Sequence, residues 1–214
     1  GDKEGRALWA FLCHRTLTGE ENPCLRPMLA ALPAHTNAGG FFGPIHTGRD
    51  GDVMVDEFQF GGSTWYLRAL CEAHRQLGDD CIPGTTPLAL AKRVFEGLYL
   101  PALGLFVSYP VDHEGLTGDM FGNELRVGNW ILCSDIGAAF LGIDGVADYY
   151  IATGDVRAYD LVREMTECFA RIDKLKIKAQ THATLSAVRG LLRMYEHTGD
   201  KRFADVALDT WNLY

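Results

Sequence analysis

The sequence predicts an all-α protein built from antiparallel helical hairpins, and three observations support this fold class. First, apolar residues recur at Leu185, Val188, Leu192 and Tyr195, which is the spacing of an amphipathic helix. Second, Thr-Gly-Asp at residues 198–200 interrupts this pattern. Glycine suits the left-handed position just past a helix, and aspartate suits the N-cap of the next one. Third, the same unit of helix, tight turn and helix can be found three more times upstream, which indicates a repeat.

The first hairpin is predicted from two amphipathic segments separated by Gly19. The first helix covers residues 4–18 and the second covers residues 23–32. Pro23 stands at the first position of the second helix, where its missing N–H removes no helical hydrogen bond. Pro33 is expected to end this helix, because proline cannot continue the hydrogen-bond ladder.

The second hairpin is predicted over residues 62–100. Its first helix closes at Gly78, and its second helix opens at Thr86, a favourable N-cap that is followed by proline. Both helices carry one apolar face, and Pro101 marks the end of the second. We therefore expect two antiparallel helices that bury these faces against the rest of the protein.

The third hairpin is predicted over residues 129–173, with its turn at residues 153–155, again Thr-Gly-Asp. The first helix of this pair is expected to run from Asn129 to about Thr153. It is apolar nearly all round, so it should be buried on every side. A short basic connector then leads into the fourth hairpin, residues 180–214.

Two long connections separate the hairpins, at residues 34–59 and 102–128. Connections of this length are uncommon in a compact domain unless they have a function. Residues 105–109 could form a short strand within the second connection. Both long connections precede the first helix of a pair, whereas the short glycine turns fall at the other end. One end of the assembly should therefore carry the long polar loops.

This asymmetry resembles the (α/α)6 barrels of carbohydrate-active enzymes, in which loops feeding the inner helices build the active site. Three segments, GGFFGP (39–44), WYLRALCE (65–72) and THATLSAVRG (181–190), are most similar to β-L-arabinofuranosidase-type glycoside hydrolases and their uncharacterised relatives. The turn phrase Tyr-x-x-Thr-Gly-Asp at residues 150–155 and 195–200 looks like the inter-helix turn of that superfamily.

The resemblance implies four of the six hairpins of such a barrel. Residues 1–214 are thus expected to form a single (α/α)-barrel domain that is a fragment of a longer catalytic domain, with the missing remainder of that domain as a partner. The cysteine cluster that binds zinc in the arabinofuranosidases has no counterpart in this sequence. The resemblance to the arabinofuranosidases therefore implies neither their zinc ion nor their cysteine nucleophile for this chain. We expect no metal and no cofactor.

Composition narrows the possible functions. The net charge is −8, which argues against a nucleic-acid partner because phosphate binding requires a basic surface. No apolar run reaches the length of a membrane span, so no membrane partner is expected. No signal peptide is visible, and the sequence assigns no cellular compartment. None of the six cysteines are two or three residues apart, so we expect buried free thiols rather than a zinc site.

Candidate site residues lie in the long loops and at the start of each inner helix. Glycoside hydrolysis needs two carboxyl groups that flank the scissile bond, and aromatic rings suit the apolar faces of sugars. Asp135 stands out because it is expected within an otherwise apolar helix, where a charge must be paired or functional. The predicted catalytic residues are Asp135, Glu57, Asp56 and Asp119, and the predicted substrate-binding residues are Gln59, Trp65, Asn129, Trp130, Gln180 and His182.

These observations favour a glycoside hydrolase that acts on a small sugar or an oligosaccharide. Two alternatives stay open. A non-catalytic helical-repeat module could bind a protein or peptide along a concave face. Another barrel enzyme, such as a sugar epimerase or a polysaccharide lyase, would share the ring of helices and differ in its catalytic residues.

Overall fold

The computed structural model describes residues 1–48, 50–111 and 125–214, and it is mostly helical, which confirms the all-α class. The candidate Asp119 lies outside the described residues. The α-helices are α1 (Asp2–Thr18), α2 (Leu25–His35), α3 (Glu57–Gly62), α4 (Thr64–Leu77), α5 (Pro87–Val94), α6 (Gly142–Thr153), α7 (Val156–Arg171), α8 (Thr181–Thr198) and α9 (Lys201–Trp211). Short 3₁₀ helices are η1 (Asp79–Cys81), η3 (Leu100–Ala102), η4 (Phe106–Ser108) and η5 (Ala138–Leu141), and η2 (Phe95–Tyr99) is a π-helix.

The predicted glycine turns are confirmed at Gly19, Gly154 and Gly199, whereas Gly78 ends α4 with different backbone angles. Gly19, Gly154 and Gly199 each follow a helix with left-handed backbone angles, a conformation that costs glycine little because it has no Cβ atom. Asp155 and Asp200 then cap α7 and α9, accepting hydrogen bonds from backbone N–H groups two residues ahead. The local turn chemistry therefore fixes where these helices end and begin.

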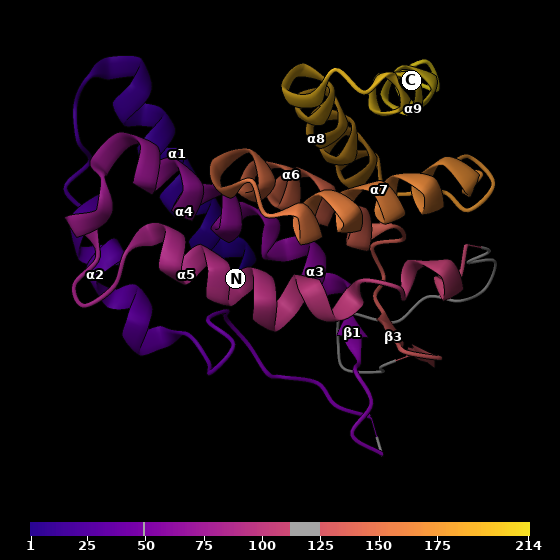
Figure 1. Ribbon diagram of the computed structural model, residues 1–214, viewed down its shortest axis with the longest axis horizontal. Helices are drawn as coiled ribbons and strands as arrows, with labels where there is room; N and C mark the ends of the chain where they lie inside the picture. The colour runs from indigo at the N-terminus through magenta and orange to yellow at the C-terminus, as the bar shows by residue number, and fades with distance from the viewer. Residues whose placement is uncertain (49, 112–124) are drawn as a thin grey trace.

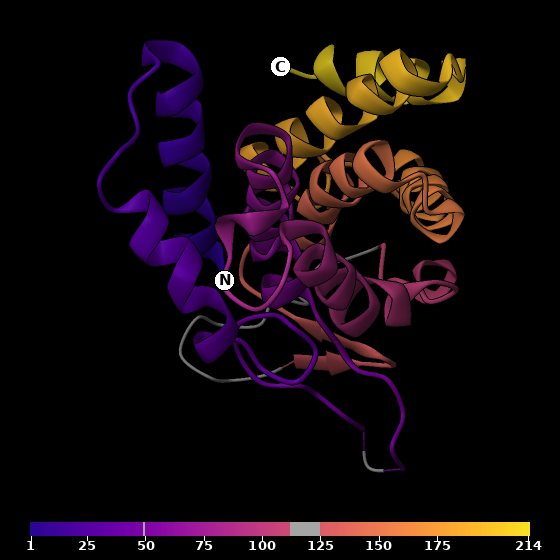
Figure 2. The same cartoon turned by 60° about the vertical axis from the view of Figure 1, so that its left-hand side comes forward.

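The first helices of the four hairpins pack side by side in chain order. Helix α1 packs on α4, α4 on α6, and α6 on α8. Figure 2 shows this row running from the indigo α1 on the left to the yellow α8 and α9 at the upper right. Helices α4 and α6 are buried over most of their length, as predicted for the inner member of each pair. Their partners α5 and α7 pack outside them (Figure 1).

A glycine lies at each crossing of neighbouring first helices. A Cβ atom on Gly5 of α1 would meet the backbone of Tyr66 at 2.4 Å, and one on Gly145 of α6 would meet Thr64 Oγ1 at 2.6 Å. A Cβ atom on Gly190 of α8 would meet the Cα of Asp144 at 2.7 Å. Real Cβ atoms do not come this close, so the row depends on glycine for its close helix approach.

A small three-stranded sheet includes residues near Asn129, where the first helix of the third hairpin was predicted to begin. Strands β1 (Val55–Asp56), β2 (Leu125–Val127) and β3 (Trp130–Leu132) lie in the order β1-β3-β2, with β1 parallel and β2 antiparallel to β3. The helix predicted from Asn129 begins only at Gly142, preceded by η5. The prediction failed because a short apolar run buried on both faces has the same periodicity whether it is strand or helix.

Two smaller predictions were also wrong. The segment 105–109 contains the 3₁₀ helix η4 (Phe106–Ser108) and is not a strand. The reason is that the carboxylate of Glu164 on α7 accepts hydrogen bonds from the backbone N–H groups of Gly104 and Phe106, at 2.7 and 2.8 Å, which folds this segment into a turn. Helix α2 also continues through Pro33 to His35. A proline this near the end of a helix removes one hydrogen bond without stopping the last turn.

The core is continuous across the hairpins and contains an aromatic cluster around Trp130. Phe106, Tyr109 and Phe140 pack on one another and surround this indole, which is fully buried.

All six cysteines are free thiols, and three of them, Cys71, Cys81 and Cys168, are buried. Within the described ranges, no helix combines the length and the apolar character needed to cross a bilayer.

Candidate functional site

The candidate site is a groove where the first helices α1, α4 and α8 begin. It consists of two adjoining hollows that share Asp2, Phe58 and Gly62. The first hollow is lined by Gly1, Asp2, Phe42, Gly43, Pro44, Asp56, Phe58, Gln59, Gly62 and Ser63. The second is lined by Asp2, Arg6, Phe58, Gly62, Asp135, Ala138, Leu141, Gln180 and His182. Five predicted site residues, Asp56, Gln59, Asp135, Gln180 and His182, thus meet at one concave surface.

In the first hollow, hydrogen bonds from Gln59 hold the long loop in place. The side chain of Gln59 donates to the carbonyl oxygens of Phe42 and Pro44, at 3.1 and 3.0 Å. The carboxylate of Asp56 caps α3 by accepting from the backbone N–H of Gln59, and it lies 3.2 Å from His46 Nε2. Asp56 and Gln59 therefore shape this wall of the groove.

In the second hollow, Asp135 and His182 line the same surface from different elements. Asp135 lies between β3 and η5, and His182 is in the first turn of α8. A hydrogen bond of 3.0 Å from the backbone N–H of Gln180 to the carbonyl of Ile136 ties these two segments together. Among the described residues, no group forms a hydrogen bond or ion pair with the Asp135 carboxylate, which leaves it available to a ligand.

His182 lies against Trp65 with the ring centroids 6.0 Å apart and the planes nearly parallel. Partial burial lowers the pKa of His182, and the positive charge of Arg6 lowers it further, while Asp2 and Asp135 act in the opposite direction. The imidazole is therefore neutral near pH 7, where it can accept a proton or a hydrogen bond.

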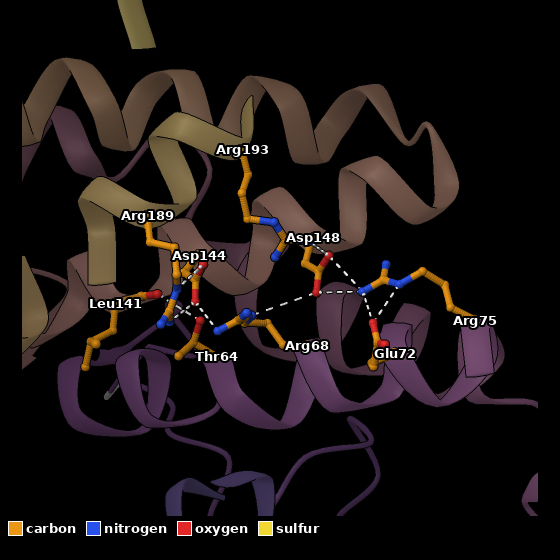
Figure 3. A network of polar contacts seen from close by, with 9 residues as sticks. All are labelled: Thr64, Arg68, Glu72, Arg75, Leu141, Asp144, Asp148, Arg189 and Arg193. Atoms are coloured by element: carbon orange, nitrogen blue, oxygen red, sulfur yellow. Dashed lines mark hydrogen bonds and ion pairs between the residues drawn. The ribbon is translucent and has the colours of Figure 1, made fainter. Parts of the chain in front are cut away.

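A network of buried and partly buried charges lies between α4, α6 and α8 (Figure 3). Asp144 and Asp148 are one turn apart on α6, and both are fully buried. Asp144 binds Arg68 and Arg189, and Asp148 binds Arg75 and Arg193. The carboxylate of Glu72 completes the network through Arg75. Because burying a charge without a partner is costly, these pairs lock the three helices in one register.

Three predicted site residues do not reach the groove. Glu57 is fully buried, and its carboxylate accepts hydrogen bonds from the Tyr109 hydroxyl at 2.5 Å and the Cys133 backbone N–H at 3.1 Å. Trp130 belongs to the aromatic core. The side chain of Asn129 donates to the carbonyl of Val53 at 2.9 Å and so joins the loop to β3. These positions hold the fold together and do not line the predicted surface.

The remaining prediction, Trp65, lies beside the groove but is only 7% exposed. The environment expected for Asp135 was also wrong, because this residue precedes the apolar helix. The argument that a charge in an apolar helix must be paired applies instead to Asp144 and Asp148 on α6. Their spacing of four residues in such a helix was the sequence signal for the network.

The groove residues that sequence reasoning missed include Asp2, Arg6 and Phe58. Asp2 and Arg6 are one turn apart at the start of α1, where Arg6 Nε donates to both carboxylate oxygens of Asp2. Candidate residues were sought at the start of the first helix of the other hairpins. The same search at the start of α1 would have found both residues. Phe58 is 54% exposed while Phe60 is fully buried. Residues two apart on a helix point in different directions, so one of these rings had to face outward.

Among the described residues, no group of three or more His, Cys, Asp or Glu side chains is placed to hold a metal ion. In comparisons with protein-family models, curated proteins and solved structures, none matched this chain.

Proposed function

We propose that this protein is a carbohydrate-active enzyme, a glycoside hydrolase that binds a small sugar or an oligosaccharide in the groove. The observation that carries the proposal is the meeting of an unpaired carboxylate, a neutral imidazole and an exposed aromatic ring, supplied by Asp135, His182 and Phe58, at the looped end of the helices. Sugar sites combine these features, since aromatic faces pack on C–H groups and polar groups fix hydroxyls.

The architecture supports the same proposal. Four successive hairpins with their first helices packed in chain order are the arrangement expected for part of an (α/α) barrel. In such a barrel the N-terminal ends of the inner helices face the same mouth. Their dipoles would favour carboxylates and polarised hydroxyl groups there.

Hydrolysis requires one carboxyl group that gives a proton to the leaving oxygen and another that acts as nucleophile or general base. We assign one of these roles to Asp135, because it has no partner among the described residues. The second carboxyl group would come from Asp2 or Asp56, which also line the groove. His182 would orient the substrate through a hydrogen bond.

A lyase or an epimerase is the second candidate, favoured by the neutral state of His182. Both reactions begin with removal of a proton from carbon, for which a neutral imidazole is a suitable base. The products separate the three reactions: a hydrolase adds water, a lyase leaves a double bond, and an epimerase keeps the mass of its substrate.

The proposal is tested by incubating the protein with a panel of aryl glycosides and oligosaccharides and identifying the products by NMR spectroscopy. We expect release of a reducing sugar from at least one substrate. Replacing Phe58 by alanine should raise KM about tenfold and leave kcat nearly unchanged, because the ring contributes to binding before the chemical step. Val156→Ala is the control, since Val156 is an exposed apolar residue on α7. Absence of hydrolysis across the panel would contradict the proposal.

A further inference from the structure

Three guanidinium groups surround the indole of Trp65 beside the groove. The guanidinium carbons of Arg6, Arg189 and Arg68 lie 4.6, 5.0 and 5.5 Å from the ring centroid. Arg6 comes from α1 and Arg189 from α8, so residues far apart in the chain meet at this ring. His182, which lines the groove, stacks on the same indole. Arg6 also lines the second hollow, so this arginine cluster adjoins the proposed sugar site.

These arginines keep unused hydrogen-bond donors. Arg6 uses only Nε to bind Asp2, so its edge formed by Nη1 and Nη2 is free among the described residues. Arg189 binds Asp144 through Nε and Nη2, which leaves Nη1. Both side chains are more than 40% exposed, at 43% and 42%. A guanidinium edge with two parallel N–H groups matches the two oxygens of a carboxylate.

The charge network also carries more positive than negative charge. It joins four arginines, Arg68, Arg75, Arg189 and Arg193, to three carboxylates, Glu72, Asp144 and Asp148. The side chain of Arg68 is 5% exposed, and its Nε and Nη1 atoms are buried without a hydrogen bond, although Nη1 lies 2.8 Å from Asp144. The indole Nε1 of Trp65 is likewise buried without a partner. Of the four arginines only Arg68 is buried, and an excess positive charge beside it favours an anion nearby.

We propose that Arg6 and Arg189, supported by Arg68 and Trp65, bind the carboxylate of a uronic acid residue while its sugar ring occupies the groove. This inference rests on the proposed function and narrows its substrate class to acidic saccharides. The free edge of Arg6 receives the carboxylate, and Arg189 contributes its remaining Nη1. Trp65 holds both guanidinium groups in position through cation–π contacts. The ring hydroxyls then face His182 and Asp135.

Titration calorimetry with the full chain tests this site without requiring catalysis. The ligands are glucuronate, galacturonate and mannuronate, each compared with its neutral parent hexose, and inorganic sulfate. At least one uronate should bind about tenfold tighter than its parent, as expected when charge-assisted hydrogen bonds are gained. Arg6→Gln should abolish that preference. Arg163→Gln, an exposed arginine on α7, should retain it.

Arg189 needs a conservative change because it also pairs with buried Asp144. Arg189→Lys keeps the charge and loses the paired donors, so it should reduce uronate binding several-fold while circular dichroism stays unchanged. Equal binding of uronates and hexoses by the unmodified chain would overturn the inference, as would a preference that survives Arg6→Gln. Sulfate binding as tight as that of the best uronate would overturn the assignment to a saccharide.

These outcomes also separate the inference from the proposed function. Hydrolysis of neutral glycosides without any preference for uronates would sustain the glycosidase proposal and overturn the acidic-substrate inference. Arginine-dependent binding of a uronate, together with no cleavage of neutral or uronic glycosides, would sustain the binding site and overturn the hydrolase.

Discussion

The imidazole of His182 lies over the indole of Trp65, with 13° between the ring planes. This contact joins the first turn of α8 to the first turn of α4, although 116 residues of chain lie between the two rings. Trp65 is 7% exposed and is surrounded by guanidinium groups, so its ring is a support for the groove and not a free stacking surface. The position of His182 therefore depends on how closely the first helices pack.

The first prediction concerns the buried charge network. Replacing Asp148 by asparagine keeps the shape of the side chain but removes the negative charge that binds Arg75 and Arg193. The free energy of unfolding should fall by about 1–3 kcal/mol, because Arg75 and Arg193, which are partly exposed, lose a charge-assisted hydrogen-bond partner.

Urea denaturation followed by circular dichroism measures this change. Asp160→Asn is the control, since Asp160 is a half-exposed carboxylate on α7, and it should change stability by less than about 0.5 kcal/mol. Equal effects of the two substitutions would show that the network does not stabilise the fold.

The second prediction concerns the close crossing of α6 and α8. A Cβ atom at residue 190 would lie 2.7 Å from the Cα and 2.8 Å from the N of Asp144, and backbone atoms cannot move aside as a flexible side chain can. Gly190→Ala should therefore lower the unfolding free energy by about 1–3 kcal/mol, the usual cost of overpacking. Ala10→Ser on the exposed side of α1 is the control in the same thermal melts. A gain in stability at residue 190 would mean that the helices are farther apart than described.

The third prediction concerns the cap of α9 and its dependence on pH. Asp200 accepts hydrogen bonds from the side chain and backbone of Arg202, which lower the pKa of its carboxyl group from 3.8 to about 2. Asp200→Ala should cost about 1 kcal/mol at pH 7. Because the folded pKa is the lower one, this stabilisation is present above pH 3.8 and is lost as the pH falls through 2.

The comparison is made by urea denaturation of the wild type and Asp200→Ala at pH 7 and near pH 2. The difference between the two proteins should shrink at the lower pH, whereas Asp205→Ala, exposed on the same helix, should have little effect at either. A difference that stays constant with pH would show that the charge of Asp200 does not contribute to the cap.

The sequence predicted the features that depend on neighbouring residues. The turns at Gly154 and Gly199 follow from glycine and the aspartate after it, which need no tertiary contact to favour a helix end. Helix α8, with Gln180 at its N-cap position, was predicted from the helical spacing of its own apolar residues. Local chemistry of this kind can be read directly along the chain.

The sequence did not predict features that depend on distant contacts. Trp130 lies in a strand because it is covered by β1, β2 and the aromatic core, and its own apolar neighbours would fit a helix equally well. Glu57 was taken for a loop carboxylate, yet Tyr109 and Cys133, 52 and 76 residues away, enclose it. Which carboxylates reach the groove could be known only once the helices were placed.

The most direct test of the account is the activity of Asp135→Asn, because Asp135 is the carboxylate assigned to the chemistry in the groove. The measurement is kcat/KM on the best aryl glycoside from the panel, with Asp160→Asn as the control and thermal melting of each variant alongside. We predict that Asp135→Asn lowers kcat/KM at least about 100-fold and leaves the melting temperature unchanged, since its carboxylate has no partner to lose among the described residues. Activity within a factor of two of the wild type in a folded Asp135→Asn protein would contradict the assignment of catalysis to this groove.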